Sequence, residues 1–428
     1  MIFRGNGGRR HRLTASLSIR VGLFGLLGAG NLGNDGSMEV ILNYLSTKHP
    51  DAIVDAMCSG PEKLKRKYAI DAIPLIWYQR HMDRRTGIIA AALKMLSKGI
   101  DTIRVAWWVR RHDVVIVPGA GVLETTLPTR AWGLPYSLFL LCAFGRFFGT
   151  KVALVSVGAN VMNQRPTRWL LNWAARLAFY RSYRDNLSRD AMRERGIDTS
   201  QDRVYPDLVF AFPAPSDSSN HDKRVGVGVM AFYGGTDDRQ CGDEIYAQYI
   251  DKMKYFVHWL VDSGHQVRLF PGDSKFDDGV VQEVLADAQS QRPNLDPGSV
   301  VAESISSLEE LMHQILLVDT MVATRYHNVV CALRLSKPTI SIGYSTKHDV
   351  VMQDMGLSEF CQSLRSLDVD RLIKQFMDLE SRSLELTQVL VERNKAKMEE
   401  IDDQFALLSS VLFRPANEPP RLQAIDAR

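Results

Sequence analysis

The chain has 428 residues, with 52 Lys and Arg against 49 Asp and Glu, 45% hydrophobic residues and a mean hydropathy of −0.13. This composition excludes a wholly disordered chain, and the length indicates two domains or one large one. Five scattered cysteines, without a CxxC pair or zinc-type Cys/His spacing, argue against a disulfide framework and a structural zinc, and they fit a reducing compartment.

Charge is unevenly distributed along the chain. Residues 1–210 carry 30 Lys and Arg against 16 Asp and Glu, whereas the remainder carries 22 against 33. A basic first half could attract an anionic substrate, a membrane surface or nucleic acid, or it could be a simple surface bias. No helix-turn-helix, RRM or zinc-finger pattern stands out, so we expect no nucleic-acid partner.

The N-terminal segment is basic and Gly-rich, and the apolar run Val21–Gly30 follows it. The pair resembles the start of a signal peptide, but no cleavage site leads into a polar mature chain. We therefore interpret residues 1–18 as a loose basic tail. A second apolar run, Tyr136–Phe148, is shorter than the roughly 20 residues that a membrane span needs. We expect a cytoplasmic protein, and a peripheral contact with the inner face of the membrane stays open.

Short β-rich runs alternate with helical patterns. The expected strands are Ile19–Leu26, Ala52–Met57, Val114–Val117, Val152–Val157, Val225–Met230, Gln266–Phe270, Thr320–Ala323 and Thr339–Ile342. The expected helices include Ser37–Thr47, Trp169–Phe179, Ser188–Arg195, Tyr246–Ser263, Leu308–Val318 and Asn328–Leu335. Nearly continuous apolar strands that alternate with helices are typical of parallel sheets covered on both faces, so the predicted fold class is α/β.

The domain boundary is predicted from a change in composition. Residues 210–223 are rich in Pro, Ser and Asp and form the best linker candidate, because the strand series restarts after them. We predict one Rossmann-like domain over residues 19–209 and a second over 224–368. Residues 369–413 are predicted to be helical, with a break near Ser381-Arg382-Ser383, and residues 414–428 form a tail.

A glycine-rich turn follows the first strand. Gly28-Ala29-Gly30-Asn31-Leu32-Gly33 has the GxGxxG pattern of dinucleotide-binding loops, and Asp55 follows at a suitable distance. The next residues, Asn34-Asp35-Gly36-Ser37, are expected to delay the helix, with Asp35 or Ser37 as its N-cap, which argues against a dinucleotide. A different ligand and a purely structural turn both stay open.

A second turn, with Gly119 and Gly121, follows the strand Val114–Val117. In an open α/β sheet, the loops after strand C-termini line the ligand crevice. Neither glycine turn has the Walker A lysine, and no GxSxG, HExxH or EF-hand pattern occurs, so neither a P-loop nor a metal site is expected.

Cationic side chains follow two successive strands of the second half. Arg325 and His327 come after Thr320–Ala323, and Tyr344 and Lys347 come after Thr339–Ile342. Because the C-terminal ends of neighbouring parallel strands lie side by side, these groups could converge on a compact anion. The alternative is a set of exposed loop cations, with His327 capping its helix.

Two residues of the first half are further candidates. Arg184 precedes a helix and could face the same crevice or simply pair with Asp185. Asp207 lies near the predicted domain boundary, where it could be a hydrogen-bond acceptor in the linker or an acid–base group.

Taken in order, these motifs resemble the polysaccharide pyruvyl transferase family over roughly residues 20–360. Gly30-Asn31-Leu32-Gly33-Asn34-Asp35 is similar to the family's G-N-x-G-D-E loop, with Asn34 and Asp35 in place of the usual Asp and Glu. Further matching segments are Val115–Gly121, Tyr183–Ser188, Arg195-Gly196-Ile197 and Tyr205-Pro206-Asp207. The most specific match is Arg325-x-His327 with Ala332, Pro338, Tyr344, Lys347 and Gly356-Leu357.

The resemblance implies a GT-B-like pair of Rossmann-type domains with a cleft between them. It implies transfer of pyruvate from phosphoenolpyruvate to two hydroxyls of a sugar, with formation of a pyruvyl ketal and release of phosphate. It implies no cofactor and no required metal. The partners would be phosphoenolpyruvate and a glycan, glycolipid or lipid-linked saccharide acceptor.

Carried over by position, Arg325 and His327 would bind phosphoenolpyruvate, and Arg184 would contribute from the other domain. Tyr344 and Lys347 are further donor-site candidates. The candidate catalytic residues are His327, as general acid or phosphate ligand, together with Arg325 and the candidate base Asp207. The loop candidates on the acceptor side are Asn31, Gly33, Asn34, Asp35, Gly119 and Gly121.

Three other functions compete with this one. A GT-B glycosyltransferase with a nucleotide-sugar donor would share the fold and the anion site. A dinucleotide-dependent oxidoreductase would use the loop Gly28–Gly33. A non-catalytic protein that binds sugar or lipid at a membrane would need neither reaction.

Overall fold

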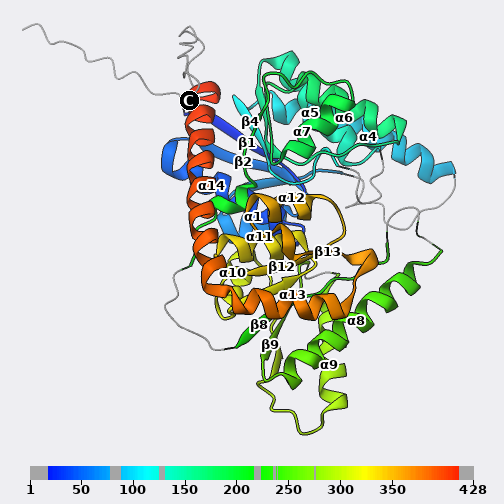
Figure 1. Ribbon diagram of the computed structural model, residues 1–428. Coiled ribbons are helices and arrows are strands. Elements are labelled where there is room, and N and C mark those ends of the chain that lie inside the picture. The colour runs from blue at the N-terminus through cyan, green and yellow to red at the C-terminus, as the bar shows by residue number, and fades with distance from the viewer. Residues whose placement is uncertain are drawn as a thin grey trace, which may run out of the picture.

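The structure is a computed structural model that describes residues 18–77, 88–124, 131–215, 223–234, 238, 240–273 and 276–413. It contains two parallel sheets, which lie one above the other in Figure 1. The predicted tails, residues 1–18 and 414–428, fall outside the described residues apart from Ser18.

The first sheet has the order β3-β2-β1-β4-β5-β6-β7, and all its strand pairs are parallel. Its strands are β1 (Arg20–Gly25), β2 (Ile53–Cys58), β3 (Asp71–Pro74), β4 (Val114–Pro118), β5 (Lys151–Val157), β6 (Tyr180–Tyr183) and β7 (Arg203–Val204). The helices of this half are α1 (Leu32–Lys48), α2 (Pro61–Tyr68), α4 (Ile88–Val109), α5 (Leu134–Phe148), α6 (Arg165–Leu177) and α7 (Asn186–Glu194).

The second sheet has the order β10-β9-β8-β11-β12-β13, again with parallel pairs. Its strands are β8 (Arg224–Gly228), β9 (Gln266–Phe270), β10 (Val300–Ala302), β11 (Thr320–Ala323), β12 (Thr339–Gly343) and β13 (Cys361–Ser363). Its helices are α8 (Gly242–Asp262), α9 (Asp278–Gln291), α10 (Leu308–Leu316), α11 (Tyr326–Arg334), α12 (Lys347–Asp354), α13 (Val369–Ser381) and α14 (Ser383–Leu412). In each sheet the chain reverses its direction of growth beside the first strand, and such switch points are where α/β sheets bind ligands.

The expected parallel α/β architecture is confirmed, and each of the eight expected strands is present within about two residues of its predicted ends. The sequence reasoning missed β3, β6, β7, β10 and β13. These strands are short, and segments such as Tyr180–Tyr183 (Tyr-Arg-Ser-Tyr) contain no continuous apolar run. Pairing with a neighbouring strand, rather than local pattern, makes them strands.

The expected late start of the first helix is wrong. α1 begins at Leu32, and Asn31 is its N-cap, whose side chain accepts a hydrogen bond from the backbone N–H of Asn34 at 3.2 Å. Glycine disfavours a helix interior, so Gly33 and Gly36 suggested a loop. Both glycines are instead packed against the second half of the chain, where they leave room for His327 and Leu308. In the same way α11 begins at Tyr326, two residues before the expected start.

Helix α14 runs along both halves of the molecule (Figure 1). Its Asn394 donates a hydrogen bond to the carbonyl of Leu333 in α11 at 2.7 Å, while its Ser409 hydrogen bonds to Tyr44 of α1 at 2.7 Å. The break between α13 and α14 at Arg382 agrees with the expected one. The helix therefore connects the two halves of the molecule.

The division into domains at residues 210–223 stays a prediction. Residues 216–222 lie outside the described part of the chain. Leu208–Ala211 form a short 3-10 helix, η1, and Phe210 and Phe212 are buried in a core cluster that includes residues of both sheets. At this point the chain is packed between the two halves and is not an exposed linker.

Candidate functional site

The C-terminal ends of the two sheets face each other, and their loops meet. Asn31, before α1, forms an isolated antiparallel bridge with Asp273, in the loop after β9. Lys347, at the start of α12, reaches Glu124 in the loop after β4 at 3.8 Å. Side chains from both halves therefore share one region, as expected for ligand crevices at strand C-termini.

Arg184, directly after β6, lies at the centre of this region. Its buried guanidinium forms an ion pair with Glu124, lies 3.5 Å from Asp185 and 3.9 Å from Asp207, and stacks over the Tyr326 ring at 5.1 Å. Burial by itself would lower the pKa of Arg184, but the surrounding carboxylates outweigh this effect and raise it. Arg184 therefore both pairs with Asp185 and faces the second half of the chain.

Glu124 is a site residue that the sequence reasoning missed. Its carboxylate lies between the two cations Arg184 and Lys347. Two glycines make room for it, because a Cβ atom on Gly121 would lie 2.7 Å from Oε2, and one on Gly158 would overlap with Oε1. Its position three residues beyond the glycine turn after β4 was the signal available in the sequence.

His327 lies in the first turn of α11, with its half-buried ring pressed against α1. A Cβ atom on Gly33 would overlap with the imidazole. Burial, followed by the nearby charges of Arg184 and Lys347, lowers the pKa of His327 to about 3. The ring is therefore neutral at physiological pH, and it makes no side-chain cap for α11.

Arg325, the N-cap residue of α11, is held by Asp277, the residue just before α9. Its guanidinium donates two hydrogen bonds, from Nε and one terminal nitrogen, to Asp277 at 2.7 and 2.6 Å. Asp277 is fully buried and also accepts backbone N–H groups of Ala231, Gly272 and Asp273. Burial alone would lower the pKa of Arg325, but Asp277 outweighs it and raises the pKa. This bidentate pair fixes the plane of the guanidinium.

Two aromatic rings surround the Lys347 ammonium. Its Nζ atom lies 5.1 Å from the centre of the Tyr326 ring and 5.4 Å from that of Tyr344. Tyr344 in turn packs edge-on against His348 at 4.7 Å. Cation–π contacts of this kind stabilise the position of a charge without neutralising it.

Asp207 is buried at the start of η1, where its carboxylate accepts the backbone N–H of Val209 at 3.1 Å. Burial raises the pKa of Asp207, although Arg184 and that hydrogen bond oppose the effect. A buried carboxyl group with a raised pKa beside a cluster of cations is a candidate proton donor.

The residues expected on the acceptor side mostly build the loop itself. Asp35 is buried and accepts hydrogen bonds from the backbone N–H of Gly28 at 2.6 Å and from Lys63 at 2.9 Å. The Asn34 side chain donates to the carbonyl of Leu26 at 3.4 Å. Gly119 has a positive φ of 52°, and a Cβ atom there would lie 2.7 Å from the Ser37 hydroxyl.

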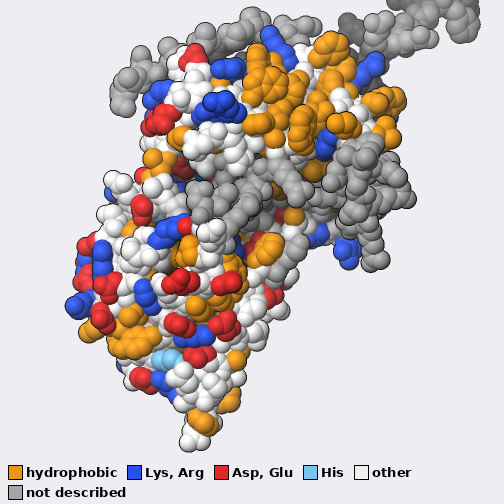
Figure 2. Space-filling view, turned by 90° about the vertical axis from the view of Figure 1, so that its right-hand side faces the viewer, with side chains coloured by type: hydrophobic (Ala, Val, Ile, Leu, Met, Phe, Trp, Pro, Cys, Tyr) orange, Lys and Arg blue, Asp and Glu red, His pale blue; other side chains and the backbone are white. Residues whose placement is uncertain are grey.

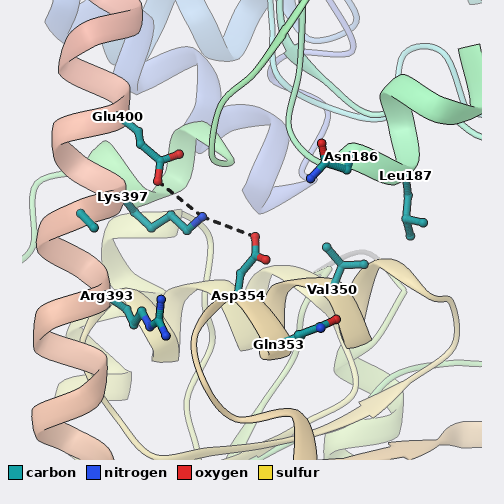
Figure 3. A pocket seen from close by; sticks show the side chains of 9 residues that line it. Asn186, Leu187, Val350, Gln353, Asp354, Arg393, Lys397 and Glu400 are labelled. Atoms are coloured by element: carbon teal, nitrogen blue, oxygen red, sulfur yellow. Dashed lines mark hydrogen bonds and ion pairs between the residues drawn. The ribbon is translucent and has the colours of Figure 1, made fainter. Parts of the chain in front are cut away.

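A cavity of about 240 Å³ opens beside the cations. Its lining includes Glu124, Arg184 and Lys347, together with Val161 and Leu187. A second cavity, of about 520 Å³, lies between α7, α12 and α14 (Figure 3), and Leu187 lines both. In the second cavity Lys397 pairs with Asp354 at 3.4 Å and with Glu400 at 3.8 Å. Among the described residues, no group of three or more His, Cys, Asp or Glu side chains could hold a metal ion.

Several solved structures share this architecture at low sequence identity. S. aureus MnaA in complex with UDP matches with a TM-score of 0.59 and 8% identity, over 94% of this chain and 100% of that one. UDP-GlcNAc 2-epimerase from Methanocaldococcus jannaschii matches with a TM-score of 0.56 and 10% identity, over 84% and 92%. Anabaena HepE in complex with UDP and glucose matches with a TM-score of 0.50 and 10% identity, over 91% and 99%. These likenesses confirm the GT-B-like pair of Rossmann-type units.

The comparison with protein families is more specific. No curated protein sequence matches the chain significantly. The family model described as polysaccharide pyruvyl transferase matches residues 31–346, which include the α1 loop, Arg184, Asp207 and the Arg325-x-His327 segment. The chain therefore belongs to the polysaccharide pyruvyl transferase family.

Proposed function

We propose that the protein transfers pyruvate from phosphoenolpyruvate to two hydroxyl groups of a saccharide or glycolipid, forming a pyruvyl ketal and releasing phosphate. The observation that supports this reaction best is the meeting of Arg184, Lys347 and His327 at the junction of the two halves. Phosphoenolpyruvate carries a carboxylate beside a phosphate, so its site needs clustered cations. No cofactor or metal takes part in the proposed reaction.

The donor would replace Glu124 as the partner of the cations. Without ligand, Glu124 contacts both Arg184 and Lys347. An incoming anion with more than one charged group can displace one carboxylate and bind the same two side chains, while Arg325 adds charge from the loop after β11. The same anion would raise the pKa of His327, because it counters the cations that now depress it.

The reaction needs one proton donor and two proton acceptors. Protonation of the methylene carbon of phosphoenolpyruvate gives an oxocarbenium-like centre at the neighbouring carbon, which the first sugar hydroxyl attacks with loss of its proton. The carbon–oxygen bond to phosphate then breaks, and the second hydroxyl adds to the same carbon and loses its proton, which closes the ketal.

The pKa directions modify the roles expected for two residues. A neutral His327 in the free protein suits a hydrogen bond to phosphate or a proton acceptor, and it becomes an acid only when the bound donor raises its pKa. Asp207, with its raised pKa, suits the proton donor better than the base. Both remain candidate catalytic residues, with Arg325 as the candidate ligand of the donor.

The decisive experiment is incubation of the protein with phosphoenolpyruvate and a panel of glycan, glycolipid and lipid-linked acceptors. We expect phosphate release that depends on the acceptor and an acceptor mass increased by one pyruvyl ketal. His327→Ala should abolish both signals while the circular dichroism spectrum is retained. Phosphate release at the wild-type rate by this variant would contradict the assignment of His327.

A nucleotide-sugar glycosyltransferase is the second candidate, because the structurally similar S. aureus MnaA and Anabaena HepE were solved with UDP. UDP should raise the melting temperature if this candidate is right, and phosphoenolpyruvate should not.

We place the proposed pyruvyl transfer in the cytoplasm, where the five cysteines, all free in the structure, would stay reduced.

A further inference from the structure

The outer surface of α4, α5 and α6 carries large apolar side chains exposed to solvent. Figure 2 shows an apolar patch with interspersed Lys and Arg over this part of the molecule. Trp107 of α4 is 63% exposed, Phe147 of α5 79%, and Trp169 of α6 56%. The aromatic face, as we call it, comprises Leu96, Ile103, Trp107, Phe147, Trp169 and Trp173. Helix α5 packs against both α4 and α6, so the three helices form one continuous layer.

The core of the protein does not require these side chains. In α6 the buried residues include Leu170, Leu171 and Ala174, whereas Trp169 and Trp173, one turn apart, lie on the opposite side of the helix. A single exposed apolar residue needs no explanation, but an extended apolar surface in a soluble domain usually marks a contact site.

The segment that contributes α5 and α6 to the aromatic face carries charge of one sign. Residues 125–184 contain eight Lys and Arg and no Asp or Glu. Arg146, Arg165, Arg168 and Arg176 are exposed, and within the described part of the chain none of them takes part in an ion pair. The acidic residue of α4, Asp101, is buried and paired with Lys98 and Arg104.

Tryptophan and arginine also contact each other on this surface. The Arg111 guanidinium lies 4.6 Å from the centre of the Trp107 ring, and that of Arg176 lies 5.6 Å from the Trp173 ring. Amphipathic aromatic rings are enriched at the headgroup level of membranes, and basic side chains bind anionic headgroups there. The charge and chemistry of the described residues on this face therefore suit an anionic lipid surface better than a basic protein partner.

We propose that the aromatic face docks the protein on the surface of an anionic lipid bilayer. The described helices include none long and apolar enough to cross a membrane, so the contact would be peripheral. Val161, which is 57% exposed and precedes α6, also lines the cavity beside Arg184. If the proposed function holds, docking would bring that cavity close to an acceptor carried on a lipid.

The test is co-sedimentation of the full chain with vesicles, without any turnover. We expect binding at low ionic strength to vesicles of phosphatidylcholine with about one-third phosphatidylglycerol, and little binding to pure phosphatidylcholine. Salt at about 0.5 M should weaken binding, because it screens the contacts to headgroups. Since the assay involves no phosphoenolpyruvate, its failure would leave the proposed reaction untouched.

Two pairs of substitutions separate the apolar and the charged part of the contact. Trp169→Ser with Trp173→Ser, and Arg165→Glu with Arg168→Glu, should each weaken binding by about tenfold or more. The matched controls lie on the far helices α13 and α14: Met377→Ser with Leu384→Ser, which are 57% and 83% exposed, and Arg371→Glu with Lys374→Glu. These controls should bind like the wild type.

Three results would overturn the proposal. The first is no binding to anionic vesicles at low ionic strength. The second is an equal loss of binding in the control variants. The third is a stable dimer of the wild type, seen by analytical ultracentrifugation, that is absent in the variant with both Trp169→Ser and Trp173→Ser, while neither the wild type nor this variant binds vesicles. The aromatic face would then be an interface between two copies of the chain.

Discussion

Gly33 of α1 and His327 of α11, which come from opposite halves of the molecule, are in direct contact. The imidazole ring occupies the space that a Cβ atom on Gly33 would fill. The first glycine loop and the cationic segment, which are almost 300 residues apart in the chain, therefore form one site.

Gly33→Ala should reduce activity strongly while it changes the helix little. Alanine favours a helix by about 1 kcal/mol over glycine, so α1 by itself would gain stability. The new methyl group, however, must displace His327 or separate the two halves. We expect phosphate release to fall by about tenfold or more, as misplacement of a site residue by 1 Å can do. The rate should be measured together with the melting temperature.

The matched control is Gly99→Ala. Gly99 lies inside α4, and a Cβ atom at this position would have open space around it, with no neighbouring atom within 4 Å. This variant should keep full activity and gain up to about 1 kcal/mol of unfolding free energy. Equal activities of the Gly33→Ala and Gly99→Ala variants would contradict the role of the Gly33–His327 contact.

Glu124→Gln should strengthen the binding of phosphoenolpyruvate. The carboxylate now competes with the donor for Arg184 and Lys347, and the neutral amide would compete less. Because Arg184 is buried, the ligand-free variant should also be less stable and should gain more from the ligand. Thermal shift titrations should give a dissociation constant lower by about threefold to tenfold. The control is Glu194→Gln, because Glu194 is an exposed residue of the same cavity. If Glu124→Gln alone weakened the binding of phosphoenolpyruvate, Glu124 would not compete with the donor.

Asp277 is predicted to act as a positioning residue for Arg325. Arg325→Lys cannot make the bidentate contact, and Asp277→Asn weakens it, so both should raise the KM for phosphoenolpyruvate. Breaking this largely buried pair should lower the unfolding free energy by about 3 kcal/mol. The control is the pair of Arg365 and Asp238, which is also bidentate but whose arginine side chain is half-exposed. Arg365→Lys should lower the unfolding free energy by less than about 1 kcal/mol. Urea unfolding and initial rates test both statements; equal effects of Arg325→Lys and Arg365→Lys would refute them.

The buried His348 and the half-buried His327 predict how stability depends on pH. Burial, followed by the charge of nearby Lys347, lowers the pKa of His348 to about 3. The pKa of His327 is likewise lowered to about 3, again mainly by burial. Their pKa in the unfolded chain is near the ordinary histidine value of 6.5. Because the folded pKa lies below the unfolded one, this stabilisation is complete above pH 6.5 and is lost as the pH falls toward 3. Each histidine should contribute up to about 1.4 kcal/mol per pH unit to the slope.

This slope should be measured by urea unfolding between about pH 5 and pH 8. His327→Gln should reduce this slope, since the contribution of His327 is removed while those of His348 and His49 remain. Replacement of the exposed His313 by Gln should leave it unchanged. An identical slope in the His327→Gln variant and the wild type would show that His327 titrates normally in the folded protein.

The sequence by itself determined the fold class and the segments that meet in the site. Continuous apolar runs such as Val114–Val117 predict buried parallel strands, because a strand covered on both faces has no polar positions. Strand ends followed by glycine or cationic residues then mark the ligand edge of each sheet. Arg184, Asp207, His327 and Lys347 could be selected in this way, and the structure places them in one region.

The tertiary structure decided which partner each charge has and how each site helix begins. Arg184 pairs with Glu124, 60 residues away, and Arg325 with Asp277, 48 residues away, and no local pattern indicates either pairing. The start of α1 at Leu32 likewise depends on contacts from the other half, which favour glycines where helix propensity disfavours them. Local propensity and periodicity report on neighbours along the chain, whereas burial, pKa and ion pairing depend on groups that only folding brings together.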